Sequence, residues 1–273
     1  MKEINPLKIT EMLKEELVKA NIEINPEVLK VLKYYSSNES IKLLLKNAEI
    51  AANKNLPLCQ DTGIVEFFVE LGSEVVISEN IESVLNRVVS EVYEQNYFRY
   101  SLVSDPLFER KNTFSNTPCV VNIEHVPGKE LKIAFLIKGG GSENLTTLKM
   151  FEPSVSQEDI IEFVVEHISN HGAKACPPLQ IGIGIGGTAE KALTLSKKAL
   201  LRSFNERNEN ILYKDLEIQL LEELNKLKIG FQGLGIGPSV LSVNIEYFPT
   251  HIATLPVALS VNCYLCRKGV IKL

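Results

Sequence analysis

Cysteines are the residues of this 273-residue chain most able to do chemistry, and they lie at positions 59, 119, 176, 263 and 266. Their number is odd and the charged N-terminus shows no export signal, so a disulfide framework is not expected. Each is then either a small buried side chain or a thiolate ligand for a metal. Cys263 and Cys266 have the C-x-x-C spacing of a redox pair or half a zinc site, but no second such pair exists. Cys119, which follows a proline, is interpreted as structural.

A short polar motif follows Cys59 directly, with Gln60, Asp61, Thr62 and Gly63 in succession. Aspartic proteases carry Asp-Thr-Gly too, but they need two carboxylates that share a proton, and this chain has one copy. Two interpretations remain open. In one, Asp61 bonds its own backbone in a turn. In the other, a cysteine ligand stands beside a polar pair, Gln60 and Asp61.

Two glycine-rich segments each follow an expected strand. Gly139 to Gly141 permit positive φ and leave amide groups accessible, which favours a carboxylate or phosphate site over a flexible loop. Gly182, Gly184 and Gly187 match G-x-G-x-x-G. A dinucleotide site and close packing of the strand against the next helix both explain that spacing. The dinucleotide interpretation is disfavoured because the chain does not alternate strands and helices regularly.

His251 is a lone histidine after a turn. Such a histidine is more often a satisfied polar residue than a catalyst.

The composition argues against two classes of partner. The net charge is −5 and no long basic stripe is present, so nucleic acid is not an expected partner. No apolar run of about 18 residues occurs, so no membrane span is expected. Because the N-terminus shows no export signal, we expect a cytoplasmic location.

Hydrophobic spacing predicts the elements that position these residues. Helices are expected over residues 5–20, 26–32, 40–52, 80–98, 156–172, 188–202 and 212–227. Strands are expected over residues 64–71, 120–126, 131–137, 179–186, 240–246 and 252–261. Pro127 and Gly128 predict a hairpin between the second and third strands.

The predicted fold class is α/β (α+β), with mixed sheets surrounded by helices and a helical N-terminal region. No linker divides the chain, so we expect a single domain over residues 1–273. Within it, residues 1–52 form a helical lobe and residues 53–273 an α/β core that carries the motifs.

Four motifs in a fixed order indicate a family. LCQDTG, KGGGSEN, ACPPLQIGIGIGGTAEKA and PTHIATLPVALSVNC follow one another between Asn53 and Arg267. Together they resemble the iron–sulfur class I fumarase and L-tartrate dehydratase family, in its α subunit or N-terminal catalytic part. Several motifs in order are far more specific than any one of them.

The resemblance implies a 4Fe-4S cluster held by Cys59, Cys176 and Cys263. Three thiolates leave one iron without a protein ligand, and such an iron acts as a Lewis acid on a substrate hydroxyl. Cys266 stands where the family usually has another residue, and we do not expect it to be a ligand.

The resemblance also implies roles for the polar residues. Asp61 is expected to be the general acid with Gln60 as its hydrogen-bond partner, and both contact substrate. Arg99 matches a family arginine that pairs with a substrate carboxylate. Gly141 is expected to offer a backbone contact to the substrate, and His251 to have a supporting catalytic role near the cluster.

The resemblance finally implies a hydro-lyase that interconverts fumarate and malate. The general base belongs to a β subunit, so we expect an α2β2 assembly and little activity from this chain alone. Alternatives are an L-tartrate dehydratase subunit, a non-catalytic iron–sulfur scaffold subunit and, on the glycine motif alone, a nicotinamide oxidoreductase.

Overall fold

The computed structural model describes residues 1–273, and the chain divides into two compact units. Unit 1 comprises Met1–Gly140 together with Arg267–Leu273, and unit 2 comprises Gly141–Cys266. The chain therefore crosses between the units twice. Each unit has its own sheet and its own core of buried side chains. We expected a single domain, with a helical lobe over residues 1–52 and a core over residues 53–273, and the two units divide the chain elsewhere. No change of composition marks either crossing, so the sequence did not indicate them.

The N-terminal region is helical, as predicted, after a short first strand. Four helices of unit 1 begin with an asparagine whose side chain accepts a backbone N–H of the first turn. Proline at the first position adds to this in α1 and α2. The helices are α1 (Pro6–Ile22), α2 (Pro26–Tyr34), α3 (Glu39–Lys54) and α4 (Ile81–Gln95).

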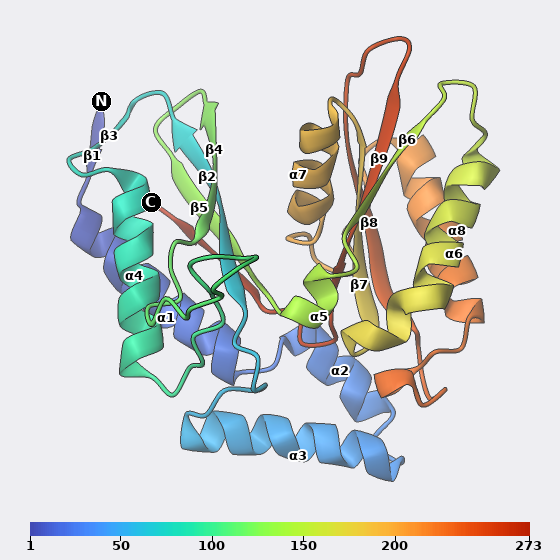
Figure 1. The fold of residues 1–273 in the computed structure, drawn as a ribbon, viewed down its shortest axis with the longest axis horizontal. Helices are drawn as coiled ribbons and strands as arrows, with labels where there is room; N and C mark the ends of the chain where they lie inside the picture. The colour runs from blue at the N-terminus through green and yellow to red at the C-terminus, as the bar shows by residue number, and fades with distance from the viewer. The chain divides into compact units, whose positions relative to one another are not determined.

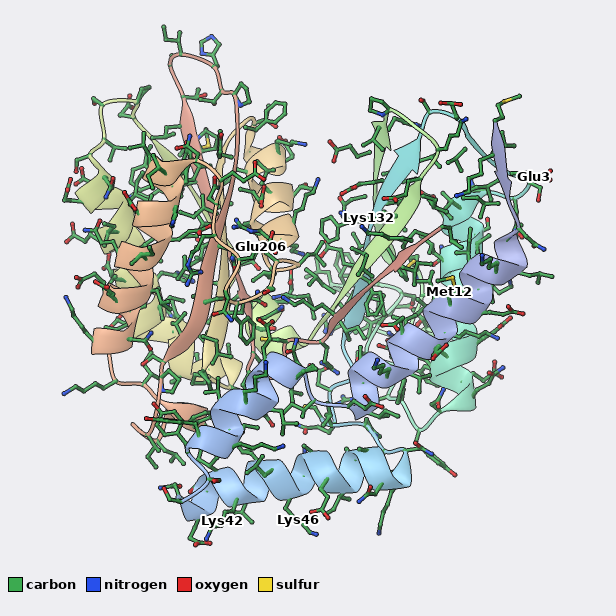
Figure 2. All side chains as sticks on the ribbon, turned by 180° about the vertical axis from the view of Figure 1, so that it is seen from behind. Glu3, Met12, Lys42, Lys46, Lys132 and Glu206 are labelled. Carbon is green, nitrogen blue, oxygen red and sulfur yellow. The ribbon has the colours of Figure 1, made fainter.

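Helix α1 is part of the core of unit 1 and does not stand apart as a lobe. Ile9, Leu13 and Leu17 recur at helical spacing, are fully buried, and pack in one cluster with side chains of α4 and the sheet. Helix α3 carries charged residues such as Lys42 and Lys46, which point outward (Figure 2) and pair with Glu39 and Glu49. The helical prediction is confirmed for these segments, but the packing makes α1 inseparable from the sheet.

The main sheet of unit 1 has the order β10-β5-β2-β4. Strand β2 pairs parallel with β4 and antiparallel with β5, so it lies between them. The predicted hairpin of the two strands flanking Pro127 and Gly128 is therefore wrong. The connection passes over the end of β2 instead, where Gly128 accepts the N–H of Glu74. The strands are β2 (Ile64–Gly72), β4 (Val120–Val126), β5 (Leu131–Lys138) and β10 (Lys268–Lys272), besides a parallel pair of β1 (Lys2–Ile4) and β3 (Val75–Ile77).

Unit 2 is a four-stranded sheet between helices, with the strand order β6-β9-β7-β8. Figure 1 shows α7 on one face of this sheet and α6 with α8 on the other. The strands are β6 (Thr147–Phe151), β7 (Leu179–Gly186), β8 (Val240–Phe248) and β9 (Leu255–Asn262). The helices are α6 (Gln157–His171), α7 (Ala189–Ala199) and α8 (Ile211–Lys226), with one-turn helices α5 (Gly140–Glu143), η1 (Gly172–Ala175) and η2 (Phe231–Gly233).

Glycines of β7 let α7 approach the sheet closely. A Cβ on Gly182 would lie 2.0 Å from the carbonyl oxygen of Ser196, and a Cβ on Gly184 would lie 2.0 Å from that of Ala192. Only glycine fits there, because helix backbone occupies the space of a side chain. The G-x-G-x-x-G spacing thus serves helix packing, the second of the two interpretations above, and needs no dinucleotide to explain it. No helix of the chain combines the length and the apolar character that a membrane crossing requires.

Candidate functional site

One edge of the unit 1 sheet gathers several of the predicted residues. In the register of β2 and β5, Ile64 lies opposite Lys138, and in that of β10 and β5, Lys268 lies opposite Leu136. The segment before β2, the glycines after β5 and the residue before β10 therefore meet at the same edge. These are residues 59–63, residues 139–140 and Arg267.

The Asp61 carboxylate is the centre of this edge. Its Oδ1 accepts the N–H of Gly63 at 3.0 Å and the hydroxyl of Ser101 at 3.3 Å. Its Oδ2 accepts the N–H of Gly140 at 2.8 Å. Both oxygens are thus used, and the side chain is held in one orientation. The bond to Gly63 agrees with the turn interpretation of Asp61, while the bonds to Ser101 and Gly140 connect it to distant segments.

The glycine segment after β5 binds the Asp61 carboxylate through the N–H of Gly140. Of the three consecutive glycines, none has positive φ, and the last two begin a one-turn helix. The positive φ that these glycines permit is therefore not used in this segment. Gly139 is needed for space, because a Cβ there would lie 3.0 Å from Asp61 Oδ2. Gly141 is exposed, and a Cβ on it would approach the Lys174 carbonyl oxygen to 3.3 Å.

Buried hydrogen bonds hold the two residues after Asp61, Thr62 and Gly63, in place. Tyr93 of α4 donates its hydroxyl to the Thr62 carbonyl oxygen at 2.5 Å. Burial raises the pKa of Tyr93 well above its ordinary value, so the hydroxyl stays protonated as a donor. Asn116, fully buried, donates to the Gly63 carbonyl at 3.0 Å and accepts the Ser101 N–H at 2.7 Å. Each bond ties the loop to a different part of unit 1.

Arg99 and Gln60 are exposed beside this buried support. The hydroxyl of Thr62 donates to the main-chain carbonyl of Arg99 at 2.7 Å, which brings the arginine to the residue after Asp61. The Cys59 thiol is partly exposed and donates to Oε1 of Gln60 at 3.4 Å. The structure therefore brings Cys59, Gln60, Asp61 and Arg99 together within unit 1.

Cys176 and Cys263 share one edge of the unit 2 sheet. Cys176 precedes β7 and Cys263 follows β9, and these strands are antiparallel, with Gln180 opposite Asn262. The N–H of Tyr264 donates to the Cys176 carbonyl at 3.1 Å, which joins the two segments directly. Cys176 has φ +51 and is exposed, while Cys263 is partly exposed.

The other two cysteines are buried. Cys266 is 1% exposed, and its thiol and its N–H both point to the Cys263 carbonyl, at 3.2 and 3.1 Å. Cys119 belongs to the core of unit 1, and burial raises the pKa of its thiol to about 12. A thiol with such a pKa stays protonated near neutral pH and is a poor metal ligand.

The five cysteines divide into two groups by accessibility. Cys59, Cys176 and Cys263 are accessible, whereas Cys119 and Cys266 are not. No group of three His, Cys, Asp or Glu side chains is assembled for a metal in the structure. A cluster with these three ligands would need Cys59 of unit 1 in addition to the two cysteines of unit 2. The donor chemistry of the three thiols fits an iron–sulfur cluster.

His251 lies away from the cysteines of its own unit. It is exposed in the loop between β8 and β9, and its Nδ1 accepts the N–H of Ala253 at 3.1 Å. Phe248 lies opposite Gly186 at the end of β7, so this loop is at the opposite edge from Cys176 and Cys263. Strand β9 lies between, and at about 3.3 Å per residue its eight residues span over 20 Å. The expectation that His251 stands near the cluster is not met within unit 2.

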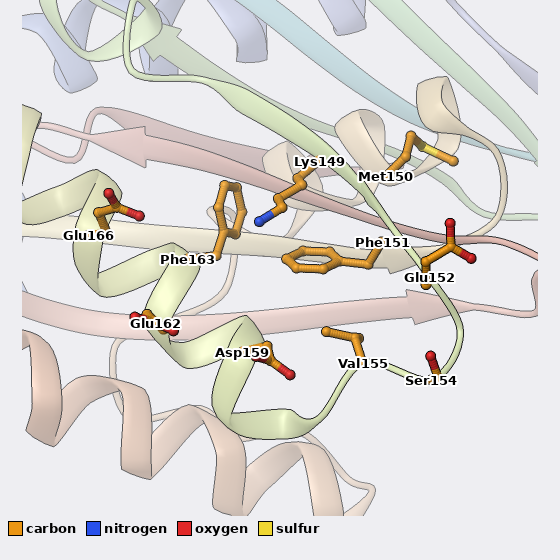
Figure 3. Close-up of a pocket in the computed structure, with 10 residues that line it drawn as sticks. All are labelled: Lys149, Met150, Phe151, Glu152, Ser154, Val155, Asp159, Glu162, Phe163 and Glu166. Carbon is orange, nitrogen blue, oxygen red and sulfur yellow. The ribbon is translucent and has the colours of Figure 1, made fainter.

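A hollow between β6 and α6 holds none of the predicted site residues. Figure 3 shows it lined by aromatic and acidic side chains, with the amino group of Lys149 between two rings. That nitrogen lies 4.4 Å from the ring centroid of Phe151 and 5.5 Å from that of Phe163. This cation–π cluster stabilises the packing of strand on helix.

The sequence analysis assigned no role to four polar residues that lie around the Asp61 loop in unit 1. Ser101 and Asn116 lie in a long irregular segment, Asn21 near the end of α1, and Arg267 directly after Cys266. The polar character of Asn21 inside an apolar helical stripe was the only signal in the sequence for its buried role.

Known proteins are similar to this chain over most of its length. The family model described as Fumarate hydratase (Fumerase) matches residues 10–272. The L(+)-tartrate dehydratase subunit alpha of Escherichia coli is 36% identical over 231 residues, which cover 84% of this chain and 76% of that protein. A Methanocaldococcus jannaschii protein that carries the same name provisionally is 38% identical over 239 residues, covering 86% and 84%. The counterpart in Shigella sonnei is 36% identical over 228 residues, covering 83% and 75%.

The family match extends over nearly the whole chain and includes the segments of the candidate site, from Cys59 to Arg267. The names of the family and of the relatives are those of enzymes that add or remove water. Because of that coverage, the protein belongs to the fumarate hydratase family of hydro-lyases.

Proposed function

We propose that this chain is the α subunit of an iron–sulfur hydro-lyase that hydrates and dehydrates a small dicarboxylate. The observation that carries the proposal is the Asp61 carboxylate, held by Gly63, Ser101 and Gly140 at the sheet edge that also presents Cys59 and Arg99. An acid to protonate the leaving oxygen and an arginine to bind a carboxylate are two of the groups that elimination of water from a hydroxy diacid needs. The thiol beside them is a ligand for a metal that activates the hydroxyl.

We propose Cys59, Cys176 and Cys263 as the ligands of a 4Fe-4S cluster. Their accessibility supports this, as do the burial of Cys119 and Cys266 and the Tyr264–Cys176 hydrogen bond that holds two of the ligand segments together. When bound, the cluster would supply an iron without a protein ligand, a Lewis acid for the substrate hydroxyl. Thiolate ligation would also release Gln60 from its bond with Cys59, leaving the amide of Gln60 for substrate.

In this proposal Asp61 transfers a proton to and from the substrate oxygen. A carboxylate has about four acceptor positions. Three are used by the Gly63, Ser101 and Gly140 donors. One position stays open for the proton, and the three bonds keep it aimed in one direction. General acid catalysis of this kind contributes about 10²- to 10⁴-fold to a rate.

Arg99 is proposed to bind a substrate carboxylate. Its guanidinium is exposed and presents two parallel N–H groups in the fork that a carboxylate accepts. The same pairing stabilises the negative charge that develops on that carboxylate when the neighbouring C–H proton leaves. Gly141, exposed at the start of α5, is proposed to add a main-chain contact to the substrate.

The general base is proposed to come from a β subunit. The relatives are named alpha subunits, which implies a partner for them, and we extend that to this chain. An α2β2 assembly is the form we propose, since twofold symmetry is the commonest arrangement. The chain alone would then bind substrate weakly and turn it over little.

Fumarate and malate are the substrate pair we propose first, because the family model is that of fumarate hydratase. L(+)-tartrate is the second candidate, favoured by the names of the relatives. Both substrates carry two carboxylates on a four-carbon chain, and both reactions remove a hydroxyl next to one of them.

The test is co-expression with a β subunit under nitrogen, followed by assays on malate, fumarate and L(+)-tartrate. We expect turnover of one of these substrates, and loss of it in Asp61→Asn with the iron content unchanged. Iron binding without turnover of any of the three would instead favour a non-catalytic scaffold subunit. Full activity in Asp61→Asn would remove this residue from the mechanism.

A further inference from the structure

Arg267 is a buried cation below the Asp61 edge of unit 1. Only 4% of the residue is exposed, and its Nε has no hydrogen-bond partner. It is the first residue of the chain's return into unit 1, and its carbonyl oxygen accepts the N–H of Ile137 at 3.0 Å. A guanidinium is always charged, and burying one is costly unless nearby groups compensate it. Its surroundings therefore have to explain its presence.

Asn21 is the hydrogen-bond partner of this cation. Nη1 of Arg267 donates to Oδ1 of Asn21 at 3.0 Å, and Nδ2 of Asn21 donates to the Leu17 carbonyl at 3.1 Å. Asn21 is itself fully buried. The main-chain carbonyl of Asn21 accepts the N–H of Leu58 at 2.8 Å, directly before Cys59. A continuous path of polar contacts thus runs from Arg267 to the first residue of the site loop.

A second path leads from Arg267 toward Asp61. A Cβ placed on Gly139 would lie 3.0 Å from Asp61 Oδ2 and 3.7 Å from Nη2 of Arg267. The carboxylate and the guanidinium therefore both border the position that a side chain on residue 139 would occupy. Opposite charges attract across such a gap, and the glycine leaves it free of a side chain.

We propose that Arg267 is a positioning residue, which with Asn21 and Gly139 holds the loop of residues 58–63 and thereby the orientation of Asp61. The inference rests on the proposed function for its catalytic consequence, but the loop position itself is a property of the chain. Arg267 acts on that loop at two places, through Asn21 at Leu58 and across the space beside Gly139 at Asp61. Lysine, with a single ammonium group, does not reproduce the planar fork.

Hydrogen–deuterium exchange of the metal-free full chain tests the proposal without any catalytic assay. In Arg267→Lys, the amides of residues 58–63 should exchange about tenfold faster than in the wild type, the effect of one weakened hydrogen bond. Arg202→Lys is the matched control. Arg202 is a largely buried arginine of unit 2 that donates to Glu217 at 3.0 Å, and its variant should leave these amides unchanged. Wild-type exchange of residues 58–63 in a folded Arg267→Lys chain would overturn the proposal.

A pair of variants at Asn21 decides the question if Arg267→Lys does not fold. Asn21→Asp keeps an acceptor for Arg267, and Asn21→Leu removes it at similar volume. We expect exchange near the wild-type rate in the first and about tenfold acceleration in the second. Equal exchange of residues 58–63 in both variants contradicts the proposal.

Kinetics of the complex with the β subunit provide the second readout. In Arg267→Lys, kcat per bound cluster should fall at least about tenfold, with KM within about twofold, because Arg99 is untouched. A raised KM with unchanged kcat would make Arg267 a substrate-binding residue and contradict positioning. If the wild-type complex turns over no dicarboxylate, the proposed function is wrong. The exchange experiment still tests the positioning of the loop, because it does not depend on turnover.

Discussion

The two units hold their site segments by different means. In unit 1, the loop before β2 is fastened by side chains of distant elements, among them Tyr93 and Asn116, besides the main-chain bond from Leu58 to Asn21. In unit 2, the turns around Cys176 and Cys263 are fastened by main-chain bonds. Tyr264 N–H binds the Cys176 carbonyl, and the N–H of Gln232 binds that of Pro177 at 2.8 Å.

This difference teaches where each unit tolerates change. Main-chain hydrogen bonds depend on the path of the backbone. In unit 2, a side chain added at a tightly packed glycine should therefore disturb the structure, whereas many side chains of the turns can be replaced with little effect. Side-chain bonds can be removed one at a time, so the loop of unit 1 can be loosened in steps. The unit that carries the proposed proton donor is thus the one whose geometry can be altered gradually.

The largest expected effect breaks unit 2 through its backbone. Gly184→Ala places a methyl group 2.0 Å from the Ala192 carbonyl oxygen, and the strand and helix must separate. We expect a loss of more than about 4 kcal/mol in the free energy of unfolding, measured by urea denaturation. Gly128→Ala is the control, since nothing lies within 4 Å of its Cβ and its positive φ alone costs about 1–3 kcal/mol. Equal stability of the two variants would contradict the close packing of α7 on β7.

Removing the acid of unit 1 should alter the reaction more than the fold. Asp61→Asn lowers kcat of the α–β complex by about 10²- to 10⁴-fold, because an amide transfers no proton in this position. Steady-state rates and iron content are measured together. Asp105→Asn is the matched control, because Asp105 also accepts backbone amides, from Leu107 and Glu109, but on an exposed loop. Comparable losses in both variants would mean that Asp61 acts only on structure.

An intermediate effect is expected at the exposed arginine of unit 1. Arg99→Lys keeps the charge but loses the fork that binds a carboxylate, so KM for the dicarboxylate should rise about 10-fold or more. Arg87→Lys serves as control, since Arg87 makes a surface ion pair with Glu79 and should change KM little. An unchanged KM in Arg99→Lys would separate this residue from substrate binding.

The smallest effect is expected when a single hydrogen bond of the unit 1 loop is removed. Tyr93→Phe deletes the hydroxyl that binds the Thr62 carbonyl and should cost about 1–2 kcal/mol of stability in thermal unfolding. Tyr213→Phe in unit 2 is the control. Tyr213 stacks on Tyr247 with ring centroids 4.2 Å apart, and the phenyl ring preserves that contact. A Tyr93→Phe protein as stable as the wild type would show that the bond does not hold the loop.

Local patterns predicted most elements of the chain, and long-range pairing was what they missed. The glycine stripe of β7 and the Ser156 cap of α6 are recognisable because neighbours in sequence determine them. Ser156 and Asp159 form a reciprocal cap. The hairpin failed because β2, some 50 residues earlier, lies between β4 and β5. The boundary at Gly140 and Gly141 was not recognised because it falls inside a motif.

The candidate site shows the same limit. Cys59, Gln60, Asp61 and Arg99 were found because motifs carry them, and the structure places all four in unit 1. Arg267 and Asn21 were not found, since 246 positions separate the two partners of that hydrogen bond. His251 was expected near the cluster because the family resemblance implies it, and within unit 2 a full strand lies between it and Cys263.

Iron and sulfide content after anaerobic reconstitution tests the central claim most directly, namely that Cys59, Cys176 and Cys263 together hold one cluster. The account predicts about four irons per wild-type chain. Serine at any of the three positions should abolish stable binding, while Cys119→Ala and Cys266→Ala should retain it. Full iron content in a Cys176→Ser chain, or its loss in Cys266→Ala alone, would contradict the assignment of the ligands.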